Sequence, residues 1–75
     1  MKHKIIGTRE NVLRAIDNSI VGYKSKRNRE ILKDHYVEGM TFEDVAEKYK
    51  MSTWQAKNIC YSREPIINAY LKGEL

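Results

Sequence analysis

Side chains that can read the bases of DNA are concentrated in one stretch of the sequence, directly after Ser52. Asparagine can form two hydrogen bonds with adenine, lysine can reach guanine or a phosphate, and threonine or tryptophan can contact the methyl group of thymine. No acid occurs between Lys50 and Arg63, so the stretch is also suited to a polyanion. The residues expected to contact bases are Thr53, Trp54, Lys57, Asn58 and Tyr61.

Basic residues that can hold backbone phosphates lie mainly in the run YKSKRNR, residues 23–29, which contains no acid. Cations in the first turn of a helix are unfavourable for the helix dipole, and a bound phosphate would relieve that conflict. A basic run is also typical of a solvated linker, and this interpretation stays open. The expected phosphate ligands are Lys24, Lys26, Arg27, Arg29, Lys50, Ser52 and Arg63.

Two helices joined by a short turn would position the base-reading residues. Thr41 can cap a helix over residues 42–49, whose first turn carries two acids. Ser52 can cap the next helix, and Gln55 three residues later completes a capping box. Apolar residues recur on one face of each helix and leave the base-reading residues on the opposite face. Residues 41–61 are therefore predicted to form a helix-turn-helix, whose second helix would lie in the major groove.

Two helices are expected before this motif. Residues 9–21, capped by Thr8, carry apolar residues at helical spacing and would pack against the core. Residues 26–38 form the second helix, with Ser25 as its cap and Gly39 in the left-handed conformation that often ends a helix.

Pro65 is expected to close the recognition helix, because the residue before a proline avoids the α conformation. Proline suits the first position of a new helix, so residues 65–72 are predicted to form a separate last helix that buries Ile66, Ile67, Tyr70 and Leu71. Residues 1–7 would form an N-terminal arm, either a flexible tail or a minor-groove contact. The expected fold is thus all-α, a small bundle of about five helices in a single domain.

Residues 29–59 resemble region 4 of the sigma-70 factors and the short phage regulators that share its helix-turn-helix. The likeness rests on REIL at 29–32, on YVEGMTFEDVAE at 36–47 and on MS at 51–52. Lys50 stands where the family usually has the turn glycine, and WQA at 54–56 replaces its usual small-Thr-Val stretch, so sigma-like promoter specificity is not implied. The resemblance implies a DNA-binding transcription regulator encoded by a phage or mobile element, with RNA polymerase as a further partner.

Composition limits the other classes of function. The 75 residues carry a net charge of +4 with a pI near 9.3, which favours an anionic partner. No paired carboxylates, Ser-His or Cys-His arrangement or phosphate-binding glycine loop can be assembled, so we expect no enzyme, and His3, His35 and Cys60 offer no metal or cofactor site. The lone cysteine and the lack of a long apolar segment favour a cytoplasmic protein without a membrane partner.

Two functions other than sequence-specific binding of double-stranded DNA stay open. The first is a protein-interaction module that binds RNA polymerase or another protein through the acids Glu43, Asp44 and Glu47. The second is the DNA-recognition subunit of a packaging or recombination complex. A homodimer would supply a second half-site for a regulator. Trp54 also has a second interpretation, as a core residue, because tryptophan is costly to expose.

Overall fold

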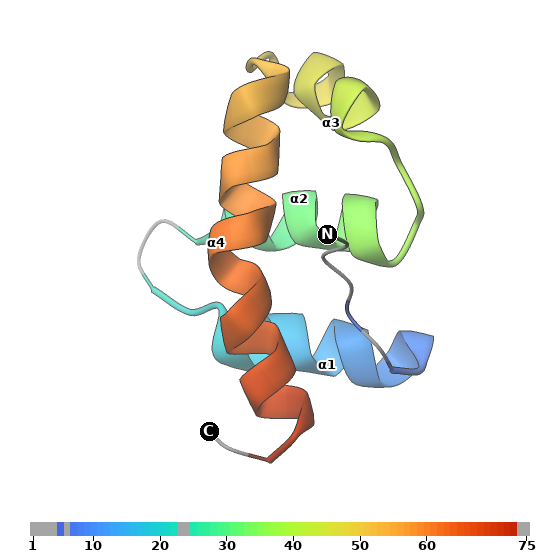
Figure 1. The fold of residues 1–75 in the computed structure, drawn as a ribbon, viewed down its shortest axis with the longest axis vertical. Helices are drawn as coiled ribbons and strands as arrows, with labels where there is room; N and C mark the ends of the chain where they lie inside the picture. Colours follow the sequence, from blue (N-terminus) through green and yellow to red (C-terminus); the bar gives the residue numbers. More distant parts are fainter. Residues whose placement is uncertain (1–4, 6, 23–24, 74–75) are drawn as a thin grey trace.

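Four helices form the part of the chain that the computed structural model describes, which is residue 5 and residues 7–22 and 25–73 (Figure 1). They are α1 (Arg9–Ser19), α2 (Lys26–Tyr36), α3 (Phe42–Tyr49) and α4 (Thr53–Leu71). No strand occurs among these residues, so the all-α class is confirmed, whereas the helices number four and not about five. Of the expected N-terminal arm, Ile5 packs against the core, and residues 1–4 and 6 lie outside the described residues.

The long helix α4 is the element on which the other three pack (Figure 1). α3 lies against its N-terminal half, α1 lies against its C-terminal half, and α2 contacts all three of the other helices. α1 and α3 do not contact each other. None of the helices in the described part of the chain has the length and apolar character needed to span a membrane.

All four helices contribute to one hydrophobic core. α1 buries Ala15 and Ile16, and α3 buries Val45 and Ala46. The largest side chains that are fully buried are Ile16, Ile31, Leu32, Val45, Cys60 and Ile67.

Pro65 lies inside α4, so the predicted break and the separate helix over residues 65–72 are both wrong. Proline has no N–H to donate to the carbonyl four residues earlier, and in a helix interior it costs about 3 kcal/mol. An unbroken helix compensates, because it buries Cys60 before the proline and Ile67 after it in the same core. The buried Glu64 also accepts a hydrogen bond from the hydroxyl of Tyr36, which holds this part of α4 against α2.

The predicted caps of α3 and α4 are confirmed. The hydroxyl oxygen of Thr41 accepts a hydrogen bond from the backbone N–H of Asp44 at 3.0 Å. Ser52 accepts from the N–H of Gln55 at 3.0 Å, while the Gln55 side chain accepts from the N–H of Ser52 at 3.0 Å, which completes the capping box. These local bonds explain why both helices begin where the sequence predicts.

α1 and α2 are both shorter than predicted. α1 ends at Ser19 and α2 ends at Tyr36, each two residues earlier than expected. As a result Val21 leaves the helix and is 67% exposed. The prediction that Ser25 caps α2 through its side chain is also wrong, because its hydroxyl donates to the carbonyl of Val21 at 3.0 Å.

A three-residue turn with left-handed backbone at its first residue joins α3 to α4. Lys50 has φ 57° and ψ 51°, and it is the only described residue other than glycine with positive φ. The N–H of Met51, next in the turn, donates to the carbonyl of Ala46 at 2.9 Å. The turn is therefore closed by backbone bonds to the end of α3, although lysine is poorly suited to its conformation.

We expect Lys50→Gly to raise the free energy of unfolding by about 0.5–1 kcal/mol, because a left-handed conformation costs a residue with a Cβ about 1–2 kcal/mol and the added freedom of the unfolded chain offsets part of the gain. Urea unfolding followed by circular dichroism would measure the change. Glu47→Gly, in the exposed face of α3, is the matched control and should lower stability by about 1 kcal/mol. Equal losses in both variants would show that the turn does not require a left-handed residue.

Candidate nucleic-acid interface

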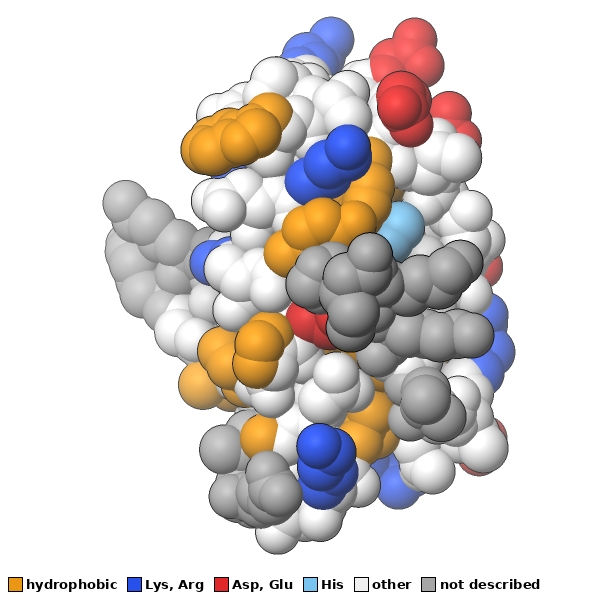
Figure 2. Space-filling model, viewed as in Figure 1, with side chains coloured by type: hydrophobic (Ala, Val, Ile, Leu, Met, Phe, Trp, Pro, Cys, Tyr) orange, Lys and Arg blue, Asp and Glu red, His pale blue; other side chains and the backbone are white. Residues whose placement is uncertain are grey.

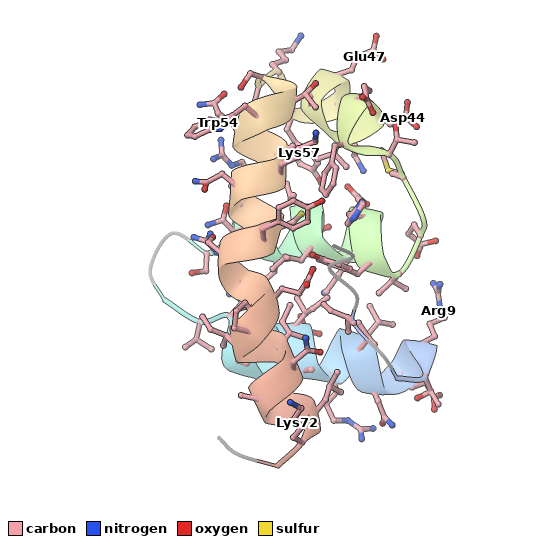
Figure 3. The ribbon with its side chains drawn as sticks, in the orientation of Figure 1. Arg9, Asp44, Glu47, Trp54, Lys57 and Lys72 are labelled. Carbon is pink, nitrogen blue, oxygen red and sulfur yellow. The ribbon has the colours of Figure 1, made fainter. Side chains whose placement is uncertain are left out.

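Four of the five expected base-reading residues form an exposed stripe along the N-terminal half of α4. They are Trp54, Lys57, Asn58 and Tyr61, at helical positions i, i+3, i+4 and i+7. Figure 3 shows Trp54 and Lys57 projecting from the first turns of α4 into solvent. Trp54 is 71% exposed, so its interpretation as a core residue is wrong.

The buried face of α4 is separate from this stripe. Ala56 and Cys60 have no exposed surface and pack in the core against α3 and its neighbours. Thr53, the fifth expected base reader, is the first residue of α4 and is half-buried. It lies at the edge of the exposed stripe.

Aromatic rings connect the stripe to the rest of the bundle. The ring of Phe42 lies edge-on to that of Tyr61, with centroids 5.4 Å apart, and it stacks on His35 at 4.0 Å. The Nδ1 atom of His35 is 2.8 Å from the carbonyl oxygen of Met40. One residue from each of α2, α3 and α4 thus contributes to this stack, which fixes the position of α3 relative to α4. Tyr61 serves packing as well as the exposed face.

A buried acid ties α2 to α3, and sequence reasoning missed it. The carboxylate of Asp34 accepts hydrogen bonds from the Nζ atom of Lys48 at 2.9 Å and from the hydroxyl of Tyr49 at 2.6 Å. Burial and the hydrogen bond from its hydroxyl to Asp34 raise the pKa of Tyr49 to about 12. The hydrogen bond from Lys48 to Asp34 raises the pKa of Lys48. The one available signal was the position of Asp34 on the apolar face, three residues after Ile31.

The expected phosphate ligands are divided between free and occupied groups. Lys26 and Arg27 are exposed at the start of α2, and Lys50 is exposed in the turn before α4. Ser52 uses its hydroxyl as the cap of α4. Lys24 lies outside the described residues.

Arg29 has a structural contact that the sequence did not reveal. Its Nη1 atom donates a hydrogen bond at 2.9 Å to the carbonyl of Ile20, the residue that caps the C-terminus of α1. A cation bonded to a helix C-terminus is favourable, because the last carbonyls have no partner within the helix. The half-buried Arg29 therefore joins α1 to α2, and this contact uses one of its guanidinium donors within the protein.

Within the described part of the chain, four exposed cations and the half-buried Arg63 form no ion pair with an acid. Three ion pairs form among the described residues, and they use Arg9, Lys33 and Lys48 as cations. Lys26, Arg27, Lys50, Lys57 and Arg63 take part in none of these three pairs.

Acidic side chains gather on the other side of this end of the molecule, over α3 (Figure 2). Asp44 and Glu47 project from α3 on the side away from Trp54 (Figure 3). The basic and aromatic face of α4 and the acidic face of α3 are thus separate surfaces. A polyanion would be attracted to the first and repelled by the second.

Within the described residues, no cluster of three His, Cys, Asp or Glu side chains is suited to hold a metal ion. The functional groups of the exposed stripe are an indole, an ammonium, an amide and a phenol, which bind through hydrogen bonds, charge and stacking. Comparison with protein-family models, with curated proteins and with solved structures gives no match for this chain.

Proposed function

We propose that this protein is a sequence-specific regulator of transcription that binds double-stranded DNA, with α3, the turn and α4 acting as a helix-turn-helix. The observation that carries the proposal is the exposed stripe of Trp54, Lys57, Asn58 and Tyr61 at the start of α4. The stripe lies between Lys50 and Arg63, which take part in none of the ion pairs among the described residues, and no acid occurs between these two cations. The likeness of residues 29–59 to sigma region 4 supports the same function and suggests a phage or mobile-element regulator.

In this proposal the N-terminal half of α4 enters the major groove, which is about 12 Å wide and accepts one helix. The amide of Asn58 pairs with an adenine, the ammonium of Lys57 reaches a guanine, and the indole of Trp54 contacts a thymine methyl group. Lys26, Arg27 and Lys50 contact phosphates and set the orientation.

The packing around α4 supports this role, because a base-reading helix needs a fixed position. The ring stack of His35, Phe42 and Tyr61 and the bonds of Asp34 hold α2, α3 and α4 together. Little ordering of the bundle would accompany binding, so less of the interaction energy would be spent on conformational entropy.

The test is selection of binding sites from a pool of random DNA duplexes, followed by sequencing. We expect enrichment of one motif that Asn58→Ala and Lys57→Ala relax at different positions. Each variant should lose about 1–3 kcal/mol of discrimination at its own base pair. Asn18→Ala, an equal change on the exposed face of α1, should select the same motif as the unmodified protein.

A palindromic motif would indicate that two copies of the chain bind together. Weak binding without enrichment, shared by all variants, would contradict the proposal. In that case the helix-turn-helix would be a scaffold for a protein partner, and RNA polymerase would be the first partner to test.

A further inference from the structure

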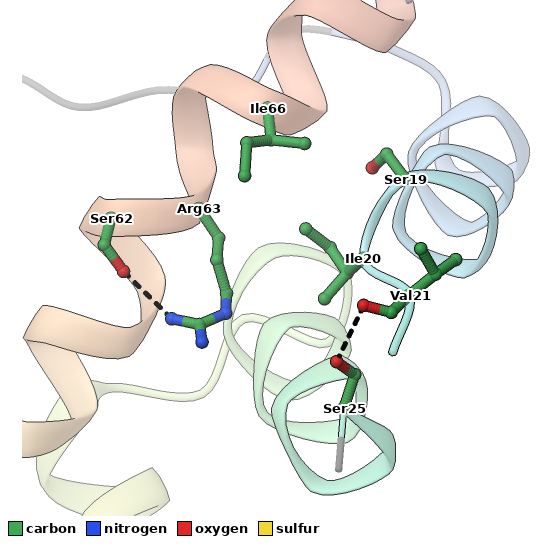
Figure 4. A pocket seen from close by; sticks show the side chains of 7 residues that line it. All are labelled: Ser19, Ile20, Val21, Ser25, Ser62, Arg63 and Ile66. Carbon is green, nitrogen blue, oxygen red and sulfur yellow. Dashed lines mark hydrogen bonds between the residues drawn. The ribbon is translucent and has the colours of Figure 1, made fainter. Parts of the chain in front are cut away.

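A hollow of about 340 Å³ opens where the end of α1 and the start of α2 meet α4 (Figure 4). One part of its wall is polar, formed by Ser25, Ser62 and Arg63, and the other part is apolar, formed by Ile20, Val21 and Ile66. No acid is among the residues that line it. The hollow is therefore suited to a ligand that combines negative charge with an apolar portion.

Arg63 supplies the charge of this hollow. Figure 4 shows its guanidinium group extending from α4 into the space between Ser62 and Ser25. Its Nη1 atom donates to the carbonyl of Ile59 at 3.2 Å and to the hydroxyl oxygen of Ser62 at 2.9 Å, which fixes the side chain. A guanidinium has five N–H donors, so the donors on Nη2 and Nε are left for a ligand.

The apolar wall is unusually open to solvent. Val21 is 67% exposed and Ile66 is 40% exposed, which makes them two of the four large exposed apolar side chains among the described residues. Both residues line the hollow, as Arg63 does. A deoxyribose ring beside a phosphate would cover such a wall while the phosphate contacts the guanidinium.

One wall residue of the hollow lies on the same ridge of α4 as two residues of the proposed base-reading stripe. Trp54, Asn58 and Ser62 follow one another at i, i+4 and i+8 on α4, and Ser62 is part of the hollow's wall. At 1.5 Å per residue, Ser62 lies about 12 Å along the axis from Trp54. The major groove is about 12 Å wide, so a helix that enters with Trp54 leaves the groove near the phosphates of its rim.

We propose that this hollow binds a phosphodiester group of the same duplex that α4 reads, with its neighbouring deoxyribose against Val21 and Ile66. The inference rests on the proposed function, and it names the contact that sets how deeply α4 enters the groove. Arg63 donates to the phosphate oxygens through Nη2 and Nε. The hydroxyls of Ser25 and Ser62 already donate to the carbonyls of Val21 and Ile59, so Arg63 supplies the contacts to the phosphate.

The experiment compares the unmodified protein with Arg63→Gln and with Arg14→Gln, using the duplex selected from the random pool. Arg14 is the control, because it is an exposed arginine of α1 outside this hollow. We expect Arg63→Gln to weaken binding about tenfold and to reduce the slope of log affinity against log salt by about 1. Arg14→Gln should change neither quantity.

Single methylphosphonate substitutions, which remove the charge of one phosphate at a time, identify the partner. At one position the substitution should weaken DNA binding by the unmodified protein and leave DNA binding by Arg63→Gln unchanged, because that variant has already lost the contact. Circular dichroism confirms that each variant is folded. Arg63→Lys, which keeps the charge, should retain the salt slope and lose part of the affinity.

The proposal is overturned if Arg63→Gln and the unmodified protein share one salt slope and one methylphosphonate profile. It is also overturned if no single phosphate distinguishes them. These results differ from a failure of the proposed function, in which the unmodified protein itself would select no duplex.

Discussion

Ile67→Ala is expected to lower the free energy of unfolding by about 2–5 kcal/mol, the range for an isoleucine removed from a close-packed core. Ile67 has no exposed surface, and it belongs to the core to which all four helices contribute, although it follows Pro65 by only two positions. A domain of this size has a small margin of stability, so a large part of the population should unfold near 37 °C. Urea unfolding followed by circular dichroism would measure the loss.

Ile66→Ala is the matched control for this prediction. Ile66 is the preceding residue of the same helix and is 40% exposed, so its truncation should cost less than about 1 kcal/mol. The ratio of the two losses shows which side of α4 faces the core after Pro65. Equal losses would contradict an uninterrupted helix through Pro65.

Alkaline pH is expected to unfold the domain. Burial raises the pKa of the Cys60 thiol to about 12, and burial with the bond to Asp34 raises that of Tyr49 to about 12. Burial and the bond to Glu64 raise the pKa of Tyr36 above its usual range. In the unfolded chain these groups release their protons near their ordinary values, about 8.5 for cysteine and 10 for tyrosine.

The direction of the effect follows from the three shifts. The folded state keeps protons that the unfolded state has lost, so stability is complete below about pH 8.5 and falls as the pH rises toward about 12. The urea midpoint should therefore decrease steadily over this interval. Tyr36→Phe and Tyr49→Phe each remove one ionisable group, so their midpoints should depend less steeply on pH. A midpoint that is constant from pH 8 to pH 11 would contradict the role of these buried groups.

The elements with local signals were predictable from the sequence. α3 begins after Thr41 and ends at Tyr49 as expected, and α4 begins with its capping box at Ser52. In both cases the groups that define the boundary lie within four residues of it. The exposure of Lys57 and Asn58 followed from the helical repeat, because the opposite positions are apolar.

The elements that depend on distant contacts were not predictable. Pro65 indicated a break because its effect on the preceding residue is local, whereas the burial of Ile67 that favours a continuous helix involves α1. Arg29 was assigned to a phosphate because its partner, the carbonyl of Ile20, lies nine residues away at the end of another helix. The contact of Asp34 with Lys48 and Tyr49 likewise joins two helices.

The interleaving of two residue sets on α4 has a consequence for how this protein can change over time. Ala56 and Cys60 pack in the core, while Trp54, Lys57 and Asn58 face outward; of the exposed stripe, Tyr61 also packs, against Phe42. Substitutions of Trp54, Lys57 and Asn58 leave the core untouched, so each is expected to alter stability by less than about 0.5 kcal/mol. Under the proposed function, a descendant or an engineered variant could therefore acquire a new binding preference by exchanging a few surface positions, without first gaining stability elsewhere.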